Sequence, residues 1–175
     1  QTLAPPHGHR RARVPPRTLL EVRQARDRAH LQEGLTVALA HLDAVIELIK
    51  ASPTPADARS ALLAKLWDPG LVAAMLGQGG AETSRPEDLE EKYGLQDSGY
   101  LLSPVQAQEI LNMRLHRLTG LEQQKLTAEY EEILNTVRDL LDILSDPSRL
   151  MTVIREELEE VLEKFGDERR TVILE

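Results

Sequence analysis

Residues 121–144 read LEQQKLTAEYEEILNTVRDLLDIL, and this stretch decides the fold. Its apolar residues recur at alternating steps of four and three, the spacing of a helix that buries one face against another helix. The apolar positions are Leu126, Tyr130, Ile133, Val137, Leu140 and Leu144. Just before them, Thr119 and Glu122 stand at the spacing of a helix capping box. The stretch therefore predicts a long helix that packs along a partner.

Residues 17–51 are the expected partner helix. They contain no proline, and their apolar residues recur at the same alternating steps of four and three. Their apolar positions are Leu31, Leu35, Ala38, Leu42, Val45 and Ile49. The returning side is interrupted at 145–147, where Ser-Asp-Pro breaks the pattern, and then continues to Phe165 with Gly166 as a C-cap. We therefore expect a first coiled-coil helix over 17–51 and antiparallel returning helices over 119–166, with a break at 145–147.

Residues 52–118 carry shorter apolar clusters separated by turn signals, as in a small globular head. Thr54 before Pro55, and Ser103 before Pro104 with Gln106, predict helix starts. We expect the second of these helices to continue to Leu118. Trp67 is expected in the core of the head, and residues 77–91 are expected to form a loop and an acidic surface excursion.

The two ends of the chain differ in composition from the predicted coiled-coil helices. Four prolines and Gly8 in residues 1–16 predict an extended arm, and residues 167–175 resemble a strand or a linker. The predicted fold class is all-α: a long antiparallel coiled-coil hairpin, interrupted by a small globular helical head, with a short strand-like C-terminal segment. The chain looks like a piece cut from a longer protein at both ends.

Composition narrows the classes of function. The chain has 175 residues, a net charge of −8 and no cysteine, which excludes disulfides, thiolate metal sites and cysteine nucleophiles. No apolar run approaches the ~20 residues of a membrane span, so we expect a cytoplasmic protein with no membrane contact. The seven arginines among residues 1–30 leave the rest of the chain acidic. Any DNA contact is therefore expected at the basic end, with candidates Arg10, Arg11, Arg13 and Arg17.

No catalytic motif stands out. The five histidines lack metal-ligand spacing, and the glycines at 77–80 are not followed by the Lys-Ser/Thr of a phosphate loop. The carboxylates of residues 156–160 have the pattern of a solvated helix face. We expect no catalytic residue, no metal site and no cofactor in this chain, which by its own residues is a scaffold.

Residues 102–122, LSPVQAQEILNMRLHRLTGLE, resemble the "LSxxQAQxILxxRLxxLTGLE" stretch of the A-subunit family of bacterial DNA gyrase. Residues 23–30, RQARDRAH, are similar to that family's "RKARxRAH". Residues 153–158 and 165–171 resemble its "VIREEL…FGDxRRT" ending. The resemblance covers about residues 17–173. The equivalent region of topoisomerase IV is a near relative, and Pro15 and Pro16 depart from the family, which usually keeps a helix there.

The resemblance implies a role in a type IIA topoisomerase, which supercoils DNA by ATP-driven strand passage. In that family this region is an antiparallel coiled-coil arm whose head meets a second copy across a twofold axis, forming the exit gate (C-gate) for transported DNA. The implied partners are a second copy, the gyrase B subunit, DNA and gyrase-poisoning toxins. The full enzyme uses ATP and magnesium. Candidate dimer-interface residues are Tyr100, Leu101, Leu102, Gln106, Ile110 and Met113.

Individual residues follow from the same resemblance. Arg114 matches the arginine of the family's "RL" pair, which is implicated in toxin binding. The DNA-cleaving tyrosine of the family lies upstream of this region, so Tyr93, Tyr100 and Tyr130 are not assigned that role. The ATPase belongs to the partner subunit, so this chain alone is expected to be non-catalytic.

Two readings from other classes stay open. One is a coiled-coil adaptor whose acidic rods bind a basic partner protein. The other is a DNA-binding module that depends on the basic N-terminal arginines. Dimerisation along residues 120–165 would favour the adaptor, whereas a salt-insensitive dimer through the head would favour the exit gate.

Overall fold

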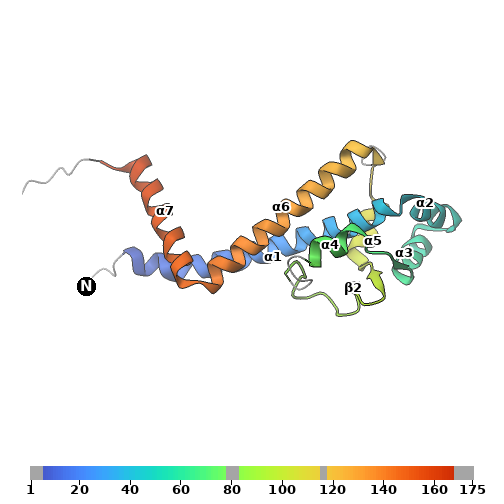
Figure 1. Cartoon of the computed structure of the whole chain (residues 1–175), viewed down its shortest axis with the longest axis horizontal. Helices are drawn as coiled ribbons and strands as arrows, with labels where there is room; N and C mark the ends of the chain where they lie inside the picture. The colour runs from blue at the N-terminus through green and yellow to red at the C-terminus, as the bar shows by residue number, and fades with distance from the viewer. Residues whose placement is uncertain (1–5, 78–82, 115–117, 168–175) are drawn as a thin grey trace, which may run out of the picture. The chain divides into compact units, whose positions relative to one another are not determined.

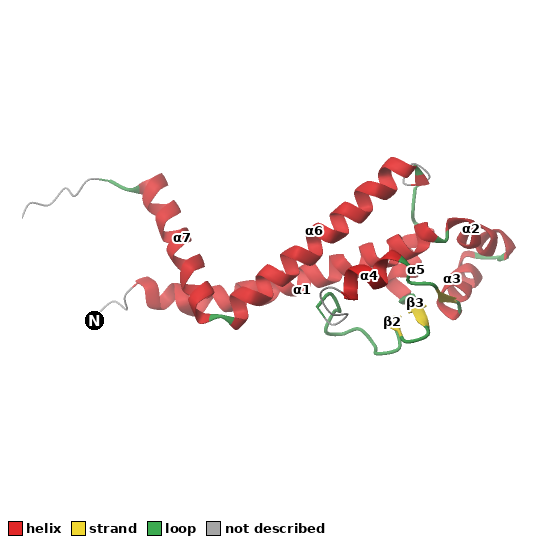
Figure 2. Cartoon of the chain, in the orientation of Figure 1, coloured by secondary structure: helices red, strands yellow, loops and turns green. Residues whose placement is uncertain are grey.

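A computed structural model describes residues 6–77, 83–114 and 118–167. These residues are mostly helical, with one small sheet (Figure 2). The helices are α1 (Pro6–Ala40), α2 (Leu42–Ala51), α3 (Pro55–Ala64), α4 (Leu71–Gly77), α5 (Pro104–Leu111), α6 (Gly120–Ser145) and α7 (Pro147–Phe165). The strands are β1 (Leu66–Trp67), β2 (Gly94–Gln96) and β3 (Gly99–Leu101). The all-α prediction with a short strand segment is confirmed. No helix of the described residues is long and apolar enough to cross a membrane.

The chain divides into two compact units, one formed by residues 21–139 and the other by residues 1–20 with 140–175. In the larger unit, α1 and α6 run in opposite directions, as the colours of Figure 1 show. Side chains of the two helices meet directly, since Gln32 donates a hydrogen bond to Glu129 over 3.1 Å. The α6 positions predicted to face a partner within this unit are buried: Leu126, Tyr130, Ile133 and Val137.

Residues 6–16 are helical, so the predicted extended arm is wrong for them. Pro15 and Pro16 lie inside α1. Proline removes one backbone hydrogen bond, but its fixed φ is compatible with the helix, so α1 continues through the pair. Nearby, the Thr18 hydroxyl donates to the Val14 carbonyl over 3.0 Å. The extended arm was predicted from the backbone amide donors that proline lacks. The helix that follows the two prolines extends through them despite these missing donors.

The predicted single rod over 17–51 is two helices, because α1 ends at Ala40 and α2 begins at Leu42. His41 lies between them with φ −119° and ψ 34°, outside the helical region. Its Nε2 atom is 2.9 Å from the Asp68 carbonyl oxygen, and its ring centroid is 5.9 Å from that of Trp67. Contacts with the head therefore fix the break, and a heptad pattern carries no signal for them.

The head contains both predicted helix caps. The Thr54 hydroxyl accepts a hydrogen bond from the Asp57 amide over 3.2 Å. Ser103 and Gln106 form a complete capping box at the start of α5. Trp67 is buried as expected. However, α5 ends at Leu111 rather than Leu118, and the Met113 amide bonds to the Ile110 carbonyl, three residues back, instead of continuing the α-helical pattern.

A three-stranded antiparallel sheet with the order β1-β3-β2 was not predicted. Its register pairs Trp67 with Tyr100, and Leu95 with the same Tyr100 from the other side. Strands of two or three residues are too short to show an alternating pattern. Gly99, the first residue of β3, has φ +147°, and a Cβ there would lie 2.8 Å from the Trp67 carbonyl oxygen. Glycine therefore permits this tight turn.

In the smaller unit, α7 begins where the sequence predicts. Asp146 caps the helix by accepting from the Ser148 amide over 2.8 Å, and Pro147 takes the first helical position. Ile154 is buried, but Val161 and Phe165 are 41% and 78% exposed, so the predicted seam does not stay buried to the end of α7. The predicted strand-like residues beyond Asp167 lie outside the described part of the chain.

Candidate functional site

A buried carboxylate lies at the centre of the larger unit. Glu33 of α1 is 5% exposed. Its Oε2 atom accepts from the Tyr130 hydroxyl of α6 over 3.2 Å and from the Ser84 hydroxyl over 3.5 Å. Burial raises the pKa of Glu33 to about 7, although hydrogen bonds from Tyr100, Tyr130 and Ser84 and the charge of Arg85 act in the opposite direction. Glu33 therefore titrates near neutral pH.

A second set of hydrogen bonds surrounds His30, one turn before Glu33. The Gln106 side-chain nitrogen donates to the His30 carbonyl over 2.6 Å and to the Tyr100 hydroxyl over 2.7 Å, and His30 Nδ1 lies 3.2 Å from the same nitrogen. On the other side of the ring, His30 Nε2 lies 2.8 Å from the Ser103 hydroxyl oxygen. Burial, aided by the charge of Arg85, lowers the pKa of His30 to about 4. The histidine is therefore neutral at pH 7.

Gly34 allows α5 to approach α1 this closely. A Cβ atom at residue 34 would lie 2.6 Å from both Cγ and Cδ of Gln106. Any larger residue would push Gln106 away from His30 and Tyr100. The glycine inside an otherwise regular helix is thus required by packing rather than by a turn.

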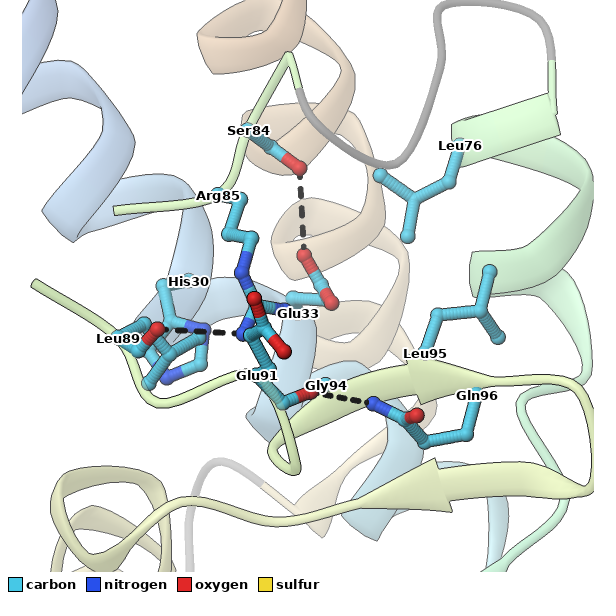
Figure 3. A pocket seen from close by; sticks show the side chains of 10 residues that line it. All are labelled: His30, Glu33, Leu76, Ser84, Arg85, Leu89, Glu91, Gly94, Leu95 and Gln96. Atoms are coloured by element: carbon cyan, nitrogen blue, oxygen red, sulfur yellow. Dashed lines mark hydrogen bonds between the residues drawn. The ribbon is translucent and has the colours of Figure 1, made fainter. Parts of the chain in front are cut away.

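A pocket of about 360 Å³ opens beside these groups, and Figure 3 shows Glu33, His30 and Arg85 along its wall. Arg85 is bonded to the segment that forms part of its lining. Its guanidinium donates to the carbonyl of Tyr93 over 2.9 Å and to those of Leu89 and Glu90 over 3.2 and 2.6 Å. On the α1 side, Arg26 donates to the Thr83 carbonyl over 3.0 Å.

The arrangement is suited to holding elements together. The hydrogen bonds join α1, α6, β3, α5 and the segment at 83–85 through side chains that are almost all buried. Burial raises the pKa of Tyr100 and of Tyr130, so both phenols stay protonated and act as hydrogen-bonding groups. Among the described residues, no group of three acidic or histidine side chains is placed to hold a metal ion. We call these side chains the polar core: His30, Glu33, Ser84, Tyr100, Ser103, Gln106 and Tyr130.

The structure shows where the predicted dimer-interface residues lie, and most of them are covered by the chain itself. Four of the six candidates are buried within the head: Tyr100, Leu102, Gln106 and Ile110. An apolar run at helical spacing is typical of a core as well as of an interface, and a role of these four residues in dimerisation stays a prediction. Leu101 and Met113 are half-buried and keep part of their surface.

The predicted charged sites lie on the surface where they are described. Arg114, the predicted toxin contact, is exposed. Arg13 is also exposed, and Arg17 pairs with Glu157 of α7. The side chains of Arg10 and Arg11 lie outside the described part of the chain. Their roles in binding remain predictions.

Glu33, Ser84 and Arg85 were not among the residues predicted from the sequence. A signal for the first was present, because Glu33 stands among apolar residues on the buried side of the helix and precedes Gly34. An acidic residue in such a place is expected to have buried partners. Ser84 and Arg85 gave no such signal, since they lie in a stretch that looks like a surface loop.

Comparison with known proteins agrees with the resemblance. A model of the family formed by the A subunits of DNA gyrase and topoisomerase IV matches residues 7–159. The chain is 57% identical over 166 residues to the DNA gyrase A subunit of Pseudomonas aeruginosa, covering 95% of this chain and 18% of that protein. It is 53% identical over 161 residues to the DNA gyrase A subunit of Aeromonas salmonicida, covering 92% of this chain and 18% of the relative.

A third relative, the DNA gyrase A subunit of Salmonella typhimurium, is 53% identical over 165 residues, covering 94% of this chain and 19% of the relative. The chain thus spans about a fifth of the length of the curated relatives it matches. The match to the family model extends over most of this chain and includes both units. The chain belongs to the A-subunit family of DNA gyrase and topoisomerase IV.

Proposed function

We propose that this chain is the exit-gate element of a gyrase A subunit, in which the head dimerises with a second copy. The observation that carries the proposal is the family match over residues 7–159, together with a head fixed to two antiparallel helices by the polar core. A gate has to hold two subunits together while DNA is cut elsewhere. A head that is rigidly joined to its helices meets that requirement.

In the whole protein, this role serves a cytoplasmic type IIA topoisomerase that changes DNA supercoiling by ATP-driven strand passage. The gyrase B subunit supplies the ATPase, which uses ATP and magnesium, and the tyrosine that cleaves DNA belongs to a part of the gyrase polypeptide outside this chain. Exposed Arg114 is the proposed contact for a gyrase-poisoning toxin. The chain alone cleaves nothing.

The proposal is tested by the mass of the 175-residue chain, measured by light scattering across a dilution series. We expect a dimer of about twice 19.6 kDa, with little dependence on salt. Leu101→Glu combined with Met113→Glu should weaken the dimer, because both side chains keep exposed apolar surface. Leu162→Glu on α7, where Leu162 is 69% exposed, is the matched control.

A monomer at every concentration would overturn the proposal. So would a dimer that the head variants leave unchanged, provided that circular dichroism shows them folded. A dimer that only Leu162→Glu disrupts would favour the coiled-coil adaptor, a reading consistent with the exposed apolar residues Val161, Leu162 and Phe165 of α7.

The proposed DNA contact has its own test. Alanine at Arg10, Arg11, Arg13 and Arg17 should weaken binding to duplex DNA and reduce the salt slope of the affinity. If affinity and slope are both unchanged, the basic end does not bind DNA.

A further inference from the structure

Glu33 is a buried carboxylate whose direct partners in the described structure are hydroxyl groups. Its Oε2 atom accepts from Tyr130 of α6 and from Ser84, and the ion pairs among the described residues join other acidic side chains. Hydroxyl groups replace only part of the water that an ionised carboxylate loses on burial. This position therefore favours the protonated, uncharged form of Glu33, in agreement with its pKa of about 7.

The titratable and charged groups around Glu33 come from α1, α6, β3 and the segment at 83–93: His30, Tyr130, Tyr100, Arg85 and Glu91. Between pH 6 and 8, the imidazole is neutral and both phenols are protonated, because burial shifts their pKa values away from this range. The positive charge of Arg85 favours an ionised Glu33, but burial has the larger effect. Glu91 is exposed, and α4 contributes the uncharged Leu76 to this site.

The segment at 83–93, which we call the flap, is the most weakly attached part of this site. It contains no helix or strand, and Ser84 is its only buried side chain. The Ser84 hydroxyl reaches Glu33 over 3.5 Å, at the long end of the hydrogen-bond range (Figure 3). In contrast, α6 buries several aliphatic side chains besides Tyr130. Segments with few buried apolar contacts open at the lowest free-energy cost, so the flap is the element that opens first.

Few interactions tie the flap to α1. Arg26 donates to the Thr83 carbonyl over 3.0 Å, and Arg23 and Arg26 pair with Glu87 over 3.0 and 3.7 Å. The side chains of Arg23 and Glu87 are 63% and 46% exposed, and ion pairs in such positions contribute little. The bonds of Arg85 end on carbonyls of the flap itself, so they hold its turns together without attaching it to α1. The flap can therefore leave α1 as one piece.

We propose that a proton controls the flap: the flap stays docked on α1 while the Glu33 carboxyl is protonated, and it is released when that carboxyl loses its proton to solvent. Release lets water reach the carboxylate through the pocket of about 360 Å³, which Glu33 lines together with four residues of the flap. Because the docked form binds the proton more tightly than the released form, low pH favours docking and rising pH favours release. The proposal does not depend on the exit-gate role.

The test is cleavage of the 175-residue chain by trypsin after Lys92, an exposed residue of the flap, followed by mass spectrometry. When release is fast relative to cleavage, the cleavage rate reports the released population. Glu33→Gln keeps the size of the side chain and cannot ionise. The rate for the unmodified chain, divided by the rate for Glu33→Gln at the same pH, cancels the pH dependence of trypsin. We expect this ratio to rise about tenfold from pH 6 to pH 8.

Two controls separate release of the flap from other changes. Glu91→Gln removes the other carboxylate that lines the pocket and should keep the rise with pH, because Glu91 is already exposed. Low concentrations of urea should speed the cleavage only slightly, since release exposes much less surface than unfolding. Equal pH dependence in the unmodified chain and Glu33→Gln would overturn the proposal. So would a urea dependence as steep as that of global unfolding, or loss of the rise in Glu91→Gln.

If Glu33→Gln does not fold, NMR of the unmodified chain gives the answer. The backbone amide signals of residues 83–93 should change with pH along the same curve as the side-chain carboxyl carbon of Glu33. Their heteronuclear NOE values should fall as pH rises through 7, while the signals of α3 stay constant. Flap signals that do not change through the Glu33 titration would overturn the proposal.

Discussion

Folding shifts the pKa values of Glu33 and His30 in opposite directions. The folded pKa of Glu33 is raised to about 7, so its contribution to stability is present at low pH and is lost as pH rises through 7. The folded pKa of His30 is lowered to about 4, so its contribution is present above its unfolded value and is lost as pH falls toward 4. Between about pH 4.5 and 6.5, the stability that Glu33 loses as pH rises is therefore offset by the stability that His30 gains.

Substitution should separate the two contributions. Glu33→Gln should become more stable relative to the unmodified chain as pH rises from 4.5 to 7, by about 3 kcal/mol. His30→Gln should become more stable relative to the unmodified chain as pH falls from 6.5 to 4, by a similar amount. Urea unfolding at a series of pH values measures both differences. Parallel stability profiles for all three proteins would show that neither group is perturbed.

Gly34 gives a second prediction for a single residue. Gly34→Ala places a Cβ 2.6 Å from Gln106, and we expect the overpacking to cost about 1–3 kcal/mol despite the better helix propensity of alanine. Gly120→Ala is the control, because a Cβ there meets nothing within 4 Å. The free energy of unfolding should fall for the first variant and stay equal or rise for the second. Equal effects would mean that α1 and α5 are not closely packed at Gly34.

Two helix starts share one local signal but differ in their surroundings. Thr54 and Ser103 are both N-caps before a proline, yet Thr54 is exposed, whereas Ser103 is buried and bonded to His30. Thr54→Ala should cost about 1 kcal/mol, the usual value of a cap. Ser103→Ala should cost about 2–3 kcal/mol, because it also leaves the imidazole without a buried partner.

Chemical denaturation of the two cap variants, compared with the unmodified chain, measures this difference. Equal losses of stability would indicate that the polar core adds nothing to the cap of α5. A larger loss for Thr54→Ala would contradict the assignment of Ser103 to the core.

Features that depend on residues close together in the sequence were predicted correctly, and features that depend on distant residues were not. Caps at Thr54 and Ser103 and the break at 145–147 were predictable, because each depends on residues within three positions along the chain. The breaks at His41 and Leu111, the small sheet and the polar core depend on partners that are far apart in the sequence. Glu33 and Ser84 are separated by 51 residues, and no periodicity reports that they meet.

At the scale of the whole molecule, the larger unit contains most of the buried apolar side chains and all of the polar core. We expect residues 21–139, expressed alone, to unfold in one cooperative transition and to keep the pH effect of Glu33→Gln. Circular dichroism during urea unfolding tests this. A non-cooperative transition, or loss of the pH effect, would show that the polar core needs residues outside the unit.

The polar core also determines how the head responds to force. A pull that separates α5 from α1 must stretch the hydrogen bond from the Gln106 amide to the His30 carbonyl and the contact between His30 and Ser103, and a pull on α6 acts on the bond between Tyr130 and Glu33. These bonds are made by neighbouring side chains. A force is therefore shared among them, and they are expected to break together rather than one after another. Within residues 21–139, we therefore expect the head and its two long helices to move as one rigid unit. A force on either helix should then reach the surface of the head with little deformation in between.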